Sequence, residues 1–357
     1  MTKEQSLNGN LEKYYGILSE EFPEFLNSYI NTPEMQKQGK ISVSCGNIYS
    51  KLFEQEWYSS LDHSIAVALI IWHFTKDKKQ TLSGLFHDIS TPVFKHTIDF
   101  LNKDYEKQES TEELTKKIIM QSNEIMSLLK KDKIDINEVY NYHIYPIADN
   151  DTPRLSSDRL EYTFSNGLGA IEKLWSLNQV KEIYDDIEIQ ENEEQVPELG
   201  FKNVEIAEKF VHTMSILSSM YNRDKTVYSM QFLADIIKEM ADKKIISAND
   251  LYKLTEKEII EKIENCTEKA MFYNEKEHTE KTISEVFEEW KKATEICTSE
   301  EEPKNRYYVS VKKVKIRYIN PLVKNAKGYK RIYEISESAK GDIQKALNHK
   351  NSKYIYI

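Results

Sequence analysis

The amino-acid sequence predicts a mostly α-helical fold with a small C-terminal α+β element. Only 10 glycines and 8 prolines occur in 357 residues, well under the average usage of about 7% and 5%, and hairpin-type dipeptides are not repeated. Lys, Glu, Ile and Leu dominate the composition, which favours helices over a sheet protein. Residues 59–74 are almost wholly apolar over one helix-length run, which is typical of a buried helix.

The N-terminal half is expected to hold several helices around that buried one. The run begins with Ser59 and Ser60 as cap candidates and an early Asp62, which is a helix-start signal. A second buried helix is expected over 79–87, and the chain should break at Ser90-Thr91-Pro92. Further helices are expected at 12–18, 20–29, 93–101, 111–130 and 156–175, with a polar loop at 104–113 and an irregular segment at 141–154.

After residue 297 the sequence pattern changes from helical periodicity to short segments of strand composition. Helical periodicity runs from 204 to about 297, and the acidic stretch 182–198 is expected to be a solvated loop or helix edge. Thr298–Pro303 predicts a linker. Beyond the linker, residues 307–319 have strand composition. Short strands are also expected at 332–335 and 354–357, around a helix near 341–347.

Composition narrows the classes of function. A net charge of −10 argues against a generally basic nucleic-acid-binding surface. No run of about 18 apolar residues occurs, so no membrane partner is expected, and the N-terminus lacks the apolar core of a secretory signal. Three widely spaced cysteines suggest a reducing, cytoplasmic setting. Only six of the 49 basic residues are arginines, and arginine is the side chain that reads phosphates bidentately.

Two histidines and an aspartate fall in buried-looking helices. His63 lies in the first apolar helix, and His87 is followed directly by Asp88 at the end of the second. Burying such groups without a partner is costly, and a divalent cation would serve all three at once. Asp158, in the first turn of a later helix, supplies a fourth candidate ligand.

This order of residues resembles the HD-domain metal-dependent phosphohydrolase superfamily. The segment His87-Asp88-Ile89-Ser90-Thr91-Pro92-Val93-Phe94-Lys95-His96-Thr97-Ile98-Asp99 is similar to the extended His-Asp segment of its deoxynucleoside triphosphate triphosphohydrolase branch. Asp62-His63-Ser64 resembles the family's Glu/Asp-His-Ser, and Asp158-Arg159-Leu160-Glu161-Tyr162 resembles its Asp-basic-x-Asp/Glu-Tyr. The spacing, 24 residues from His63 to His87 and 70 from Asp88 to Asp158, also suits that family.

The resemblance implies a set of roles. It implies an HD-domain helical bundle core and one divalent metal ion (Mn, Mg, Fe, Ni or Zn), held by His63, His87, Asp88 and Asp158. It implies catalytic roles for Asp88, His96 and Asp99, and substrate contacts for Thr91, Arg159 and Tyr162. A nucleotide is the implied substrate, and assembly into homo-oligomers is common in the family.

The resemblance and the linker together divide the chain into three parts. They are a phosphohydrolase core at 1–178, a helical accessory region at 179–298 and a small C-terminal region with short strands at 299–357. Ser90 stands where the family has glycine, and Tyr58-Ser59-Ser60 replaces an arginine found there before the first metal histidine.

The resemblance implies hydrolysis of a deoxynucleoside triphosphate to nucleoside and triphosphate. Phosphomonoester or phosphodiester hydrolysis, and nucleotide sensing with weak turnover, stay open as alternatives.

Overall fold

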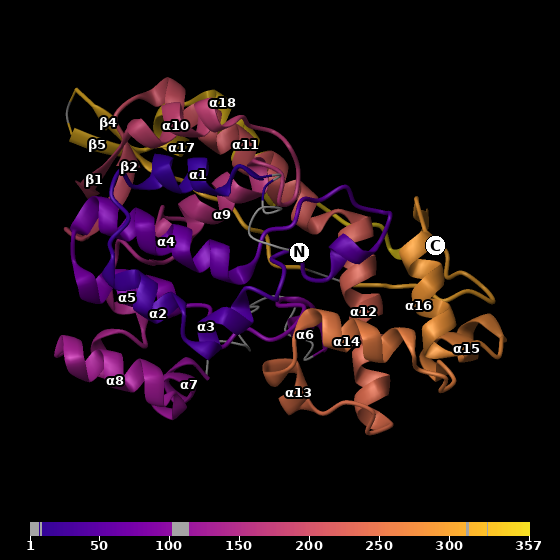
Figure 1. The fold of residues 1–357 in the computed structure, drawn as a ribbon. Coiled ribbons are helices and arrows are strands. Elements are labelled where there is room, and N and C mark those ends of the chain that lie inside the picture. The colour runs from indigo at the N-terminus through magenta and orange to yellow at the C-terminus, as the bar shows by residue number, and fades with distance from the viewer. Residues whose placement is uncertain (1–6, 8, 102–113, 312–313, 327) are drawn as a thin grey trace.

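The structure, a computed structural model, describes residues 7, 9–101, 114–311, 314–326 and 328–357. It is mostly helical with two small sheets, which confirms the predicted mostly-α class with a small β element (Figure 1). Within the described ranges, no helix is both long and apolar enough to cross a bilayer.

The helices and strands have the following bounds. The first nine helices are α1 (Leu11–Leu18), α2 (Phe25–Ile30), α3 (Pro33–Gln38), α4 (Ser60–Thr75), α5 (Lys78–Phe86), α6 (Thr97–Leu101), α7 (Thr115–Gln121), α8 (Asn123–Asp132) and α9 (Ser157–Gly167). They are followed by α10 (Leu177–Asp185), α11 (Val204–Asn222), α12 (Asp224–Asp242), α13 (Ala248–Lys253), α14 (Glu256–Glu264), α15 (Met271–Glu277), α16 (Ile283–Lys292), α17 (Ile332–Ile335) and α18 (Glu337–Leu347). Strands β1 (Ile187–Glu191), β2 (Pro197–Phe201), β4 (Leu322–Asn325) and β5 (Gly328–Arg331) form one sheet in that order, and β3 (Cys297–Ser299) pairs with β6 (Tyr354–Tyr356).

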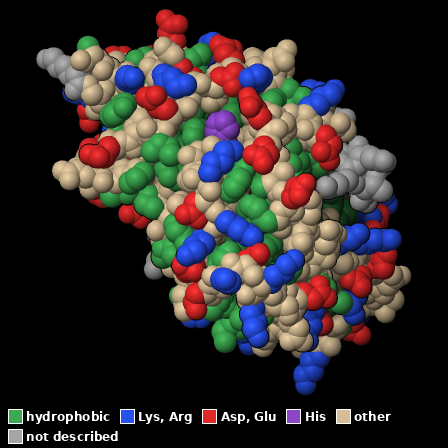
Figure 2. Space-filling model, turned by 60° about the vertical axis from the view of Figure 1, so that its left-hand side comes forward, with side chains coloured by type: hydrophobic (Ala, Val, Ile, Leu, Met, Phe, Trp, Pro, Cys, Tyr) green, Lys and Arg blue, Asp and Glu red, His purple; other side chains and the backbone are tan. Residues whose placement is uncertain are grey.

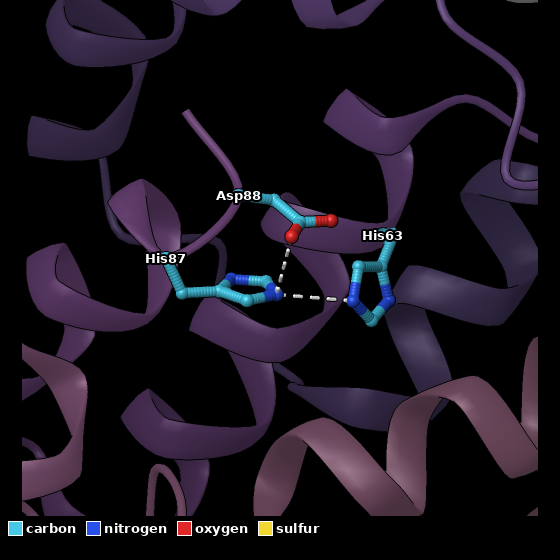
Figure 3. A group of neighbouring side chains, drawn as sticks. All are labelled: His63, His87 and Asp88. Carbon is cyan, nitrogen blue, oxygen red and sulfur yellow. Dashed lines mark hydrogen bonds and ion pairs between the residues drawn. The ribbon is translucent and has the colours of Figure 1, made fainter. Parts of the chain in front are cut away.

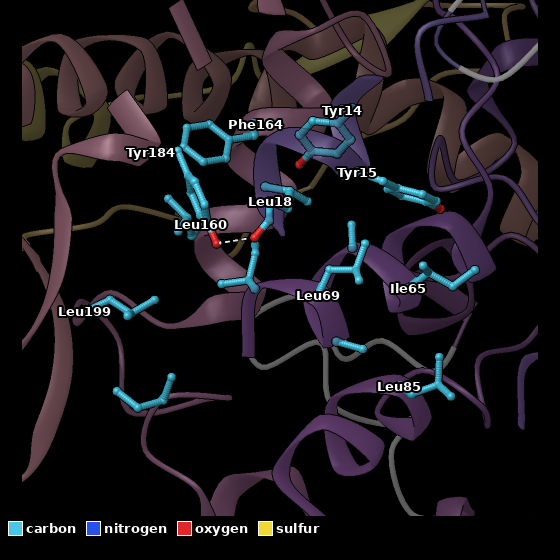
Figure 4. Packing of buried hydrophobic residues seen from close by; sticks show 14 of the residues in the cluster. Tyr14, Tyr15, Leu18, Ile65, Leu69, Leu85, Leu160, Phe164, Tyr184 and Leu199 are labelled. Carbon is cyan, nitrogen blue, oxygen red and sulfur yellow. Dashed lines mark hydrogen bonds between the residues drawn. The ribbon is translucent and has the colours of Figure 1, made fainter. Parts of the chain in front are cut away.

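Helix α4 is the centre of the N-terminal core. Residues 60–71 are all buried, because α1, α3, α5 and α9 surround the helix. Figure 4 shows Leu69 and Ile65 of α4 facing Tyr14, Tyr15 and Leu18 of α1. The predicted start is confirmed: the Ser59 hydroxyl accepts a hydrogen bond from the Asp62 amide at 3.0 Å, and the Asp62 carboxylate accepts from the Ser59 amide at 3.1 Å.

Helices α4 and α5 pack unusually closely. A Cβ atom at Gly84 would lie 2.3 Å from Cδ1 of Ile71 and 3.4 Å from Cγ1 of Val67, so only glycine fits without moving those side chains. The close approach brings the beginning of α4, with His63, next to the end of α5, where His87 follows Phe86. The second predicted buried helix is thereby confirmed.

A second apolar core lies around α12, on the right of Figure 1 with α14 and α16. It takes residues from 41–53, from 93–100 and from 227–309. The first core takes buried residues from 7–35, from 58–89 and from 119–214 and, from the C-terminal region, Ile319, Val323, Ile332, Ala339 and Ile343. Each core therefore combines segments that lie far apart in the sequence. The three-part division at 178 and 298 stays a prediction.

The predicted helix at 93–101 is wrong in its first half. The helix α6 begins only at Thr97, because Phe94 and Lys95 have φ values of +65° and +43°. This left-handed conformation is costly for residues with a Cβ. It interrupts the helix and turns Lys95 back toward Asp88.

The acidic stretch 182–198 forms regular structure and not a solvated loop. Its first residues end α10, and β1 pairs with β2 in antiparallel register, with Ile187 opposite Phe201. Glu198 is fully buried and receives two N–H groups of Arg331, at 2.6 and 2.9 Å. An arginine from β5, 133 residues away, therefore compensates the buried carboxylate.

Other element bounds also differ from the expectations. Residues 307–311 and 314–319 form a coil and not a strand, apart from one bridge between Val309 and Ile355, and residues 332–335 are helical. The helix predicted at 156–175 ends at Gly167, because the amides of Leu174 and Trp175 turn back to its carbonyl at 2.8 Å. The predicted helix 111–130 is divided between α7 and α8 at Ser122. The predicted loop 104–113 and positions 111–113 of that helix lie outside the described residues.

The surface carries mixed charge. On the face in Figure 2, basic and acidic side chains are interspersed.

A buried carboxyl group ties the N-terminal segment to α14. Glu256 is fully buried, and its Oε2 accepts a hydrogen bond from the Ser42 amide at 2.7 Å. Burial raises the pKa of Glu256 to about 8, although the hydrogen bonds from Ser42 and Tyr49 act in the opposite direction. The folded state therefore keeps the proton at pH values where the unfolded chain has lost it.

We expect Glu256→Gln to reduce the loss of stability on alkalinisation. Between the ordinary pKa of 4.5 and about 8, the unfolded state releases a proton that the folded state retains, so the free energy of unfolding falls as pH rises. Glutamine cannot ionise, and the variant should gain on the order of 1–3 kcal/mol over wild type between pH 5 and pH 8. Melting temperatures at pH 5, 6.5 and 8 measure this, with the exposed Glu261→Gln as control. Parallel curves for Glu256→Gln and wild type would contradict the assignment.

Candidate metal centre

Of the four side chains predicted as metal ligands, His63, His87 and Asp88 have ligand atoms within 4.8 Å of one another, and Asp158 lies against the two histidines. His63 comes from α4, His87 and Asp88 from the turn after α5, and Asp158 from the first turn of α9. His63 Nε2 lies 3.1 Å from His87 Nε2 and 3.1 Å from Asp158 Oδ1. His87 Nε2 lies 3.7 Å from Asp158 Oδ1 and 3.8 Å from Asp88 Oδ1. Figure 3 shows His63, His87 and Asp88 pointing toward one another.

The hydrogen-bond partners of the two Nδ1 atoms determine which ring nitrogens of His63 and His87 face the cluster of candidate ligands. His87 Nδ1 lies 2.7 Å from the Gly84 carbonyl oxygen, which only accepts, so Nδ1 carries the proton. His63 Nδ1 is hydrogen-bonded to the Glu161 carboxylate, so it donates as well. In the neutral rings both Nε2 atoms then carry lone pairs, and these face each other at 3.1 Å. Two lone pairs and two carboxylate oxygens repel one another unless positive charge lies between them.

A divalent cation fits this donor set. Imidazole nitrogens and carboxylate oxygens bind such ions at about 2.0–2.2 Å, which puts neighbouring donors about 3–3.5 Å apart. The observed separations of 3.1–3.8 Å are close to that. A hydrogen bond from the second ring nitrogen to a carboxylate or carbonyl is the usual support of a metal-binding histidine, and both histidines have one.

Protons would take the place of the cation when none is bound. Burial lowers the pKa of His63, but Glu161 and Asp158 outweigh burial and raise that pKa to about 10. The pKa values of Asp88 and Asp158 are lowered despite burial: Lys95 and the two histidines act on Asp88, and the two histidines act on Asp158. Both carboxylates are therefore ionised, as ligands must be.

Glu161 contacts a candidate ligand, and sequence reasoning gave it no role. It is fully buried, and its Oε1 accepts hydrogen bonds from Tyr58 at 2.7 Å and Tyr14 at 3.0 Å. Its other oxygen binds His63. Its place three residues after Asp158, on the same helix face, was the available signal. Glu161 thus orients His63 and fixes its tautomer.

Lys95 occupies the outer side of Asp88. Its Nζ lies 2.5 Å from Asp88 Oδ2 and 3.3 Å from the Ser60 hydroxyl. The left-handed turn at Phe94 and Lys95 produces this approach.

His96 lies on the wall of the same cavity. Its Nδ1 donates to Asp99 Oδ2 at 2.9 Å, and its Nε2 accepts from Arg317 Nη2 at 3.3 Å. Burial and the nearby cations Arg317 and Lys95 lower its pKa, against the effect of Asp99. His96 is therefore a neutral imidazole. Asp99 is fully buried beneath it and positions the ring.

The three predicted substrate contacts have different surroundings. Tyr162 lines the cavity. Thr91 is buried against Gln38 and Asp88 and does not line it. Arg159 lines the cavity, but its guanidinium binds the Arg154 carbonyl at 2.7 Å, Asn150 Oδ1 at 2.7 Å and Asp149 Oδ1 at 3.0 Å. The N–H groups of the Arg159 guanidinium are therefore already bonded to the loop 149–154.

That loop has a histidine partner at the cavity. Asp149 Oδ2 lies 2.9 Å from Nδ1 of His143, and His143 lines the cavity beside Tyr142. The Tyr142 ring in turn packs against His87, with centroids 5.2 Å apart. Arg159 thus acts on the cavity wall through Asp149.

The four candidate ligands open into a cavity of about 450 Å³. Such a volume is in the range of small-molecule sites. Its lining includes the cationic residues Lys95, Lys315 and Arg317. The lining also includes aromatic and aliphatic residues, among them Tyr162, Ile171, Tyr221, Met230 and Ile316.

Comparisons with known proteins give two kinds of relative. No family model matches the chain. A curated relative, the uncharacterized protein YdhJ of Bacillus subtilis (strain 168), is 26% identical over 217 residues, which is 59% of this chain and 63% of the relative. The match thus spans less than two thirds of that protein's length.

Two solved structures share the fold. One is a hypothetical protein from Aquifex aeolicus, with a TM-score of 0.58 and 17% identity, covering 94% of this chain and 93% of that one. The other is a phosphohydrolase from Bacteroides thetaiotaomicron, with a TM-score of 0.59 and 13% identity, covering 94% and 96%. At such identities the likeness concerns the fold, and one protein with that fold is a phosphohydrolase.

We expect two graded effects on metal binding. His87→Ala removes a ligand and should abolish stoichiometric binding of Mn²⁺ or Zn²⁺. Glu161→Gln keeps every ligand but removes the charge behind His63, and should weaken binding about 10–100-fold. Calorimetric titration and elemental analysis measure both. The control is His212→Ala, whose exposed ring pairs with Asp342. Wild-type metal affinity in His87→Ala would refute the site, and wild-type affinity in Glu161→Gln would remove Glu161 from it.

Proposed function

We propose that the protein is a metal-dependent phosphohydrolase acting on nucleotides, and that a deoxynucleoside triphosphate is hydrolysed to nucleoside and triphosphate. The observation that carries the proposal is the close approach of the Nε2 atoms of His63 and His87, 3.1 Å apart, beside the carboxylates of Asp88 and Asp158, at the edge of a cavity with cationic groups. The fold shared with a phosphohydrolase supports the reaction class. The HD-type assignment, the nucleotide and the homo-oligomeric assembly rest on the sequence resemblance.

The chemistry that a divalent cation supplies when bound here is polarisation of a phosphoryl oxygen and activation of water near neutral pH. The protein's own residues supply position and charge. Asp88 directs Oδ1 toward the imidazoles and Oδ2 toward Lys95, so the carboxylate connects the ligand cluster to an ammonium group. Phosphoryl transfer depends mainly on such positioning and charge neutralisation.

The cavity suits a nucleotide better than a bare phosphate ester. Its lining includes Lys95, which is bound to Asp88, and also Tyr162, Tyr221, Ile171 and Met230, which offer apolar and aromatic surface. A nucleotide likewise combines charged phosphates with a flat base on a sugar. The Arg159 guanidinium is bonded to the loop 149–154. Arg159 therefore contributes to the shape of the cavity.

The decisive experiment is product analysis. The purified protein is incubated with each deoxynucleotide and ribonucleotide and with Mn²⁺, Mg²⁺, Fe²⁺, Ni²⁺ or Zn²⁺, and products are identified by mass. Release of triphosphate is the expected result. Orthophosphate or a ring-opened nucleotide would favour the phosphomonoesterase or phosphodiesterase alternative, and tight binding without turnover would favour nucleotide sensing. A metal-loaded protein that neither binds nor hydrolyses any nucleotide would refute the nucleotide assignment.

We also expect His96→Ala to lower turnover about 10²–10⁴-fold, the usual contribution of an acid–base or orienting group, while metal content stays at the wild-type level. His96 lies at the cavity but is not among the candidate ligands. Steady-state kinetics and elemental analysis on the same preparation separate the two effects, with His212→Ala as the matched control. Wild-type turnover in His96→Ala would reduce His96 to a packing residue.

A further inference from the structure

Two cationic side chains lie over one buried aromatic ring at the start of α12. The Phe53 side chain is buried, and its ring centroid lies 5.5 Å from Arg223 Cζ and 5.2 Å from Lys225 Nζ. Arg223 directly precedes α12, and Lys225 is in the first turn of that helix. A ring face attracts a cation through its quadrupole but carries no negative charge. The ring therefore gathers two positive charges at one place without neutralising them.

In the part of the chain that the structure describes, neither cation has an ion-pair partner. Lys225 Nζ donates to the Leu52 carbonyl at 2.6 Å, which is a neutral acceptor. The Arg223 Nε is buried, and no group of the described residues accepts its proton. A buried N–H group without an acceptor is costly, and more so when it is charged. Arg223 thus has hydrogen-bonding capacity that the described chain does not use.

The acidic groups near these cations compensate them only in part. Burial lowers the pKa values of both Arg223 and Lys225, and the Arg223 charge lowers that of Lys225 further. Glu172 acts in the opposite direction on both, and Glu54 on Lys225, yet both pKa values stay below the ordinary ones. The two positive charges therefore repel each other in a partly buried setting, where an added anion would be stabilising.

The turn that joins α11 to α12 separates this cation pair from the cavity. Asn222 and Thr226 line the cavity, whereas Arg223 and Lys225 do not. Asp224 lies between the two cations in sequence, but its Oδ1 is bound by the C-terminal segment, at 2.9 and 3.1 Å. The cation pair is thus a feature of its own and not a wall of the candidate catalytic cavity.

We propose that Arg223, supported by Lys225, forms a second anion site that binds one phosphate group. A guanidinium binds two phosphate oxygens at once. Two cations match the charge of about −1.5 to −2 that a phosphate group carries near neutral pH, whereas a carboxylate carries a single charge. Phe53 is only 7% exposed, so its ring offers no surface on which a base could stack. The site therefore recognises the phosphate group itself, in orthophosphate or in a larger phosphate compound.

The test measures binding by calorimetry at low, constant ionic strength. Orthophosphate, triphosphate, a nucleoside triphosphate and acetate are titrated into Arg223→Gln, Lys225→Gln and Arg306→Gln and into their parent. The parent is His87→Ala, which lacks a candidate metal ligand, so that binding through a metal in the cavity does not contribute. Arg306 is the matched control, because its guanidinium also lies over a ring, that of Tyr356 at 5.4 Å, but is exposed.

The parent should bind one orthophosphate per chain, more tightly than acetate, and should bind triphosphate and the nucleoside triphosphate equally well. Arg223→Gln should lose about 10-fold or more in orthophosphate affinity, the usual effect of losing hydrogen bonds to a charged group. Lys225→Gln should lose several-fold, and Arg306→Gln should match the parent. Glu172→Gln should bind orthophosphate more tightly, because it removes the carboxylate that opposes an anion there.

The outcomes test this inference independently of the proposed function. A parent that binds no orthophosphate, or an Arg223→Gln variant that binds it like the parent, overturns the inference. A nucleoside triphosphate that binds much more tightly than triphosphate overturns the assignment to the phosphate group alone. If Arg223→Gln does not fold, Glu172→Gln decides, since a gain in affinity cannot result from misfolding and its absence overturns the inference. Wild type that hydrolyses no nucleotide refutes the proposed function and leaves this site unaffected.

Discussion

The candidate site depends on two imidazole rings whose Nε2 atoms are held 3.1 Å apart inside the protein. Neither ring is free to turn away, because the outer nitrogen of His63 is bound to buried Glu161 and that of His87 to the Gly84 carbonyl. The carboxylates of Asp88 and Asp158 add negative charge to the same point. Burying two histidines and two carboxylates together is costly unless their charges are compensated, so the cluster could hold a metal ion.

Support for the centre comes from close packing and from a chain of polar contacts. Gly84 allows α5 to approach α4, and Tyr14 and Tyr58 hold Glu161. At the cavity, the Arg159 guanidinium pairs with the Asp149 carboxylate, and this carboxylate in turn pairs with His143. The backbone of Phe94 and Lys95 adopts a left-handed conformation that places the lysine on Asp88. Such local strain persists where surrounding structure enforces it.

The cavity lies where the two apolar cores meet. Its wall includes Cys45 and Met230, which belong to or pack against the second core, and Tyr162 and Tyr318, which pack against the first. The C-terminal coil then crosses it, with Arg317 on His96. Residues that begin far apart in the chain therefore share one site, and the C-terminal region is part of that site. The solved phosphohydrolase that shares this fold extends over 94% of the chain, which covers the same combination of regions.

The sequence by itself determined the parts of the structure that depend on local pattern. The apolar run after Ser59 forms α4 with its predicted cap, the His-Asp pair ends α5, and Ser156 caps the helix that carries Asp158. Two of the four candidate ligands, His87 and Asp88, could thus be placed at the end of one helix, and His63 and Asp158 within the first turns of two others. What only the tertiary structure decided were contacts over long separations. Glu198 is buried because Arg331 arrives from another strand, Lys95 reaches Asp88 through a backbone conformation that composition does not signal, and Arg317 meets His96 across 221 residues. Periodicity and capping report the surroundings of a residue along its own helix, whereas these pairings depend on how separate elements pack, and packing is a property of the whole chain.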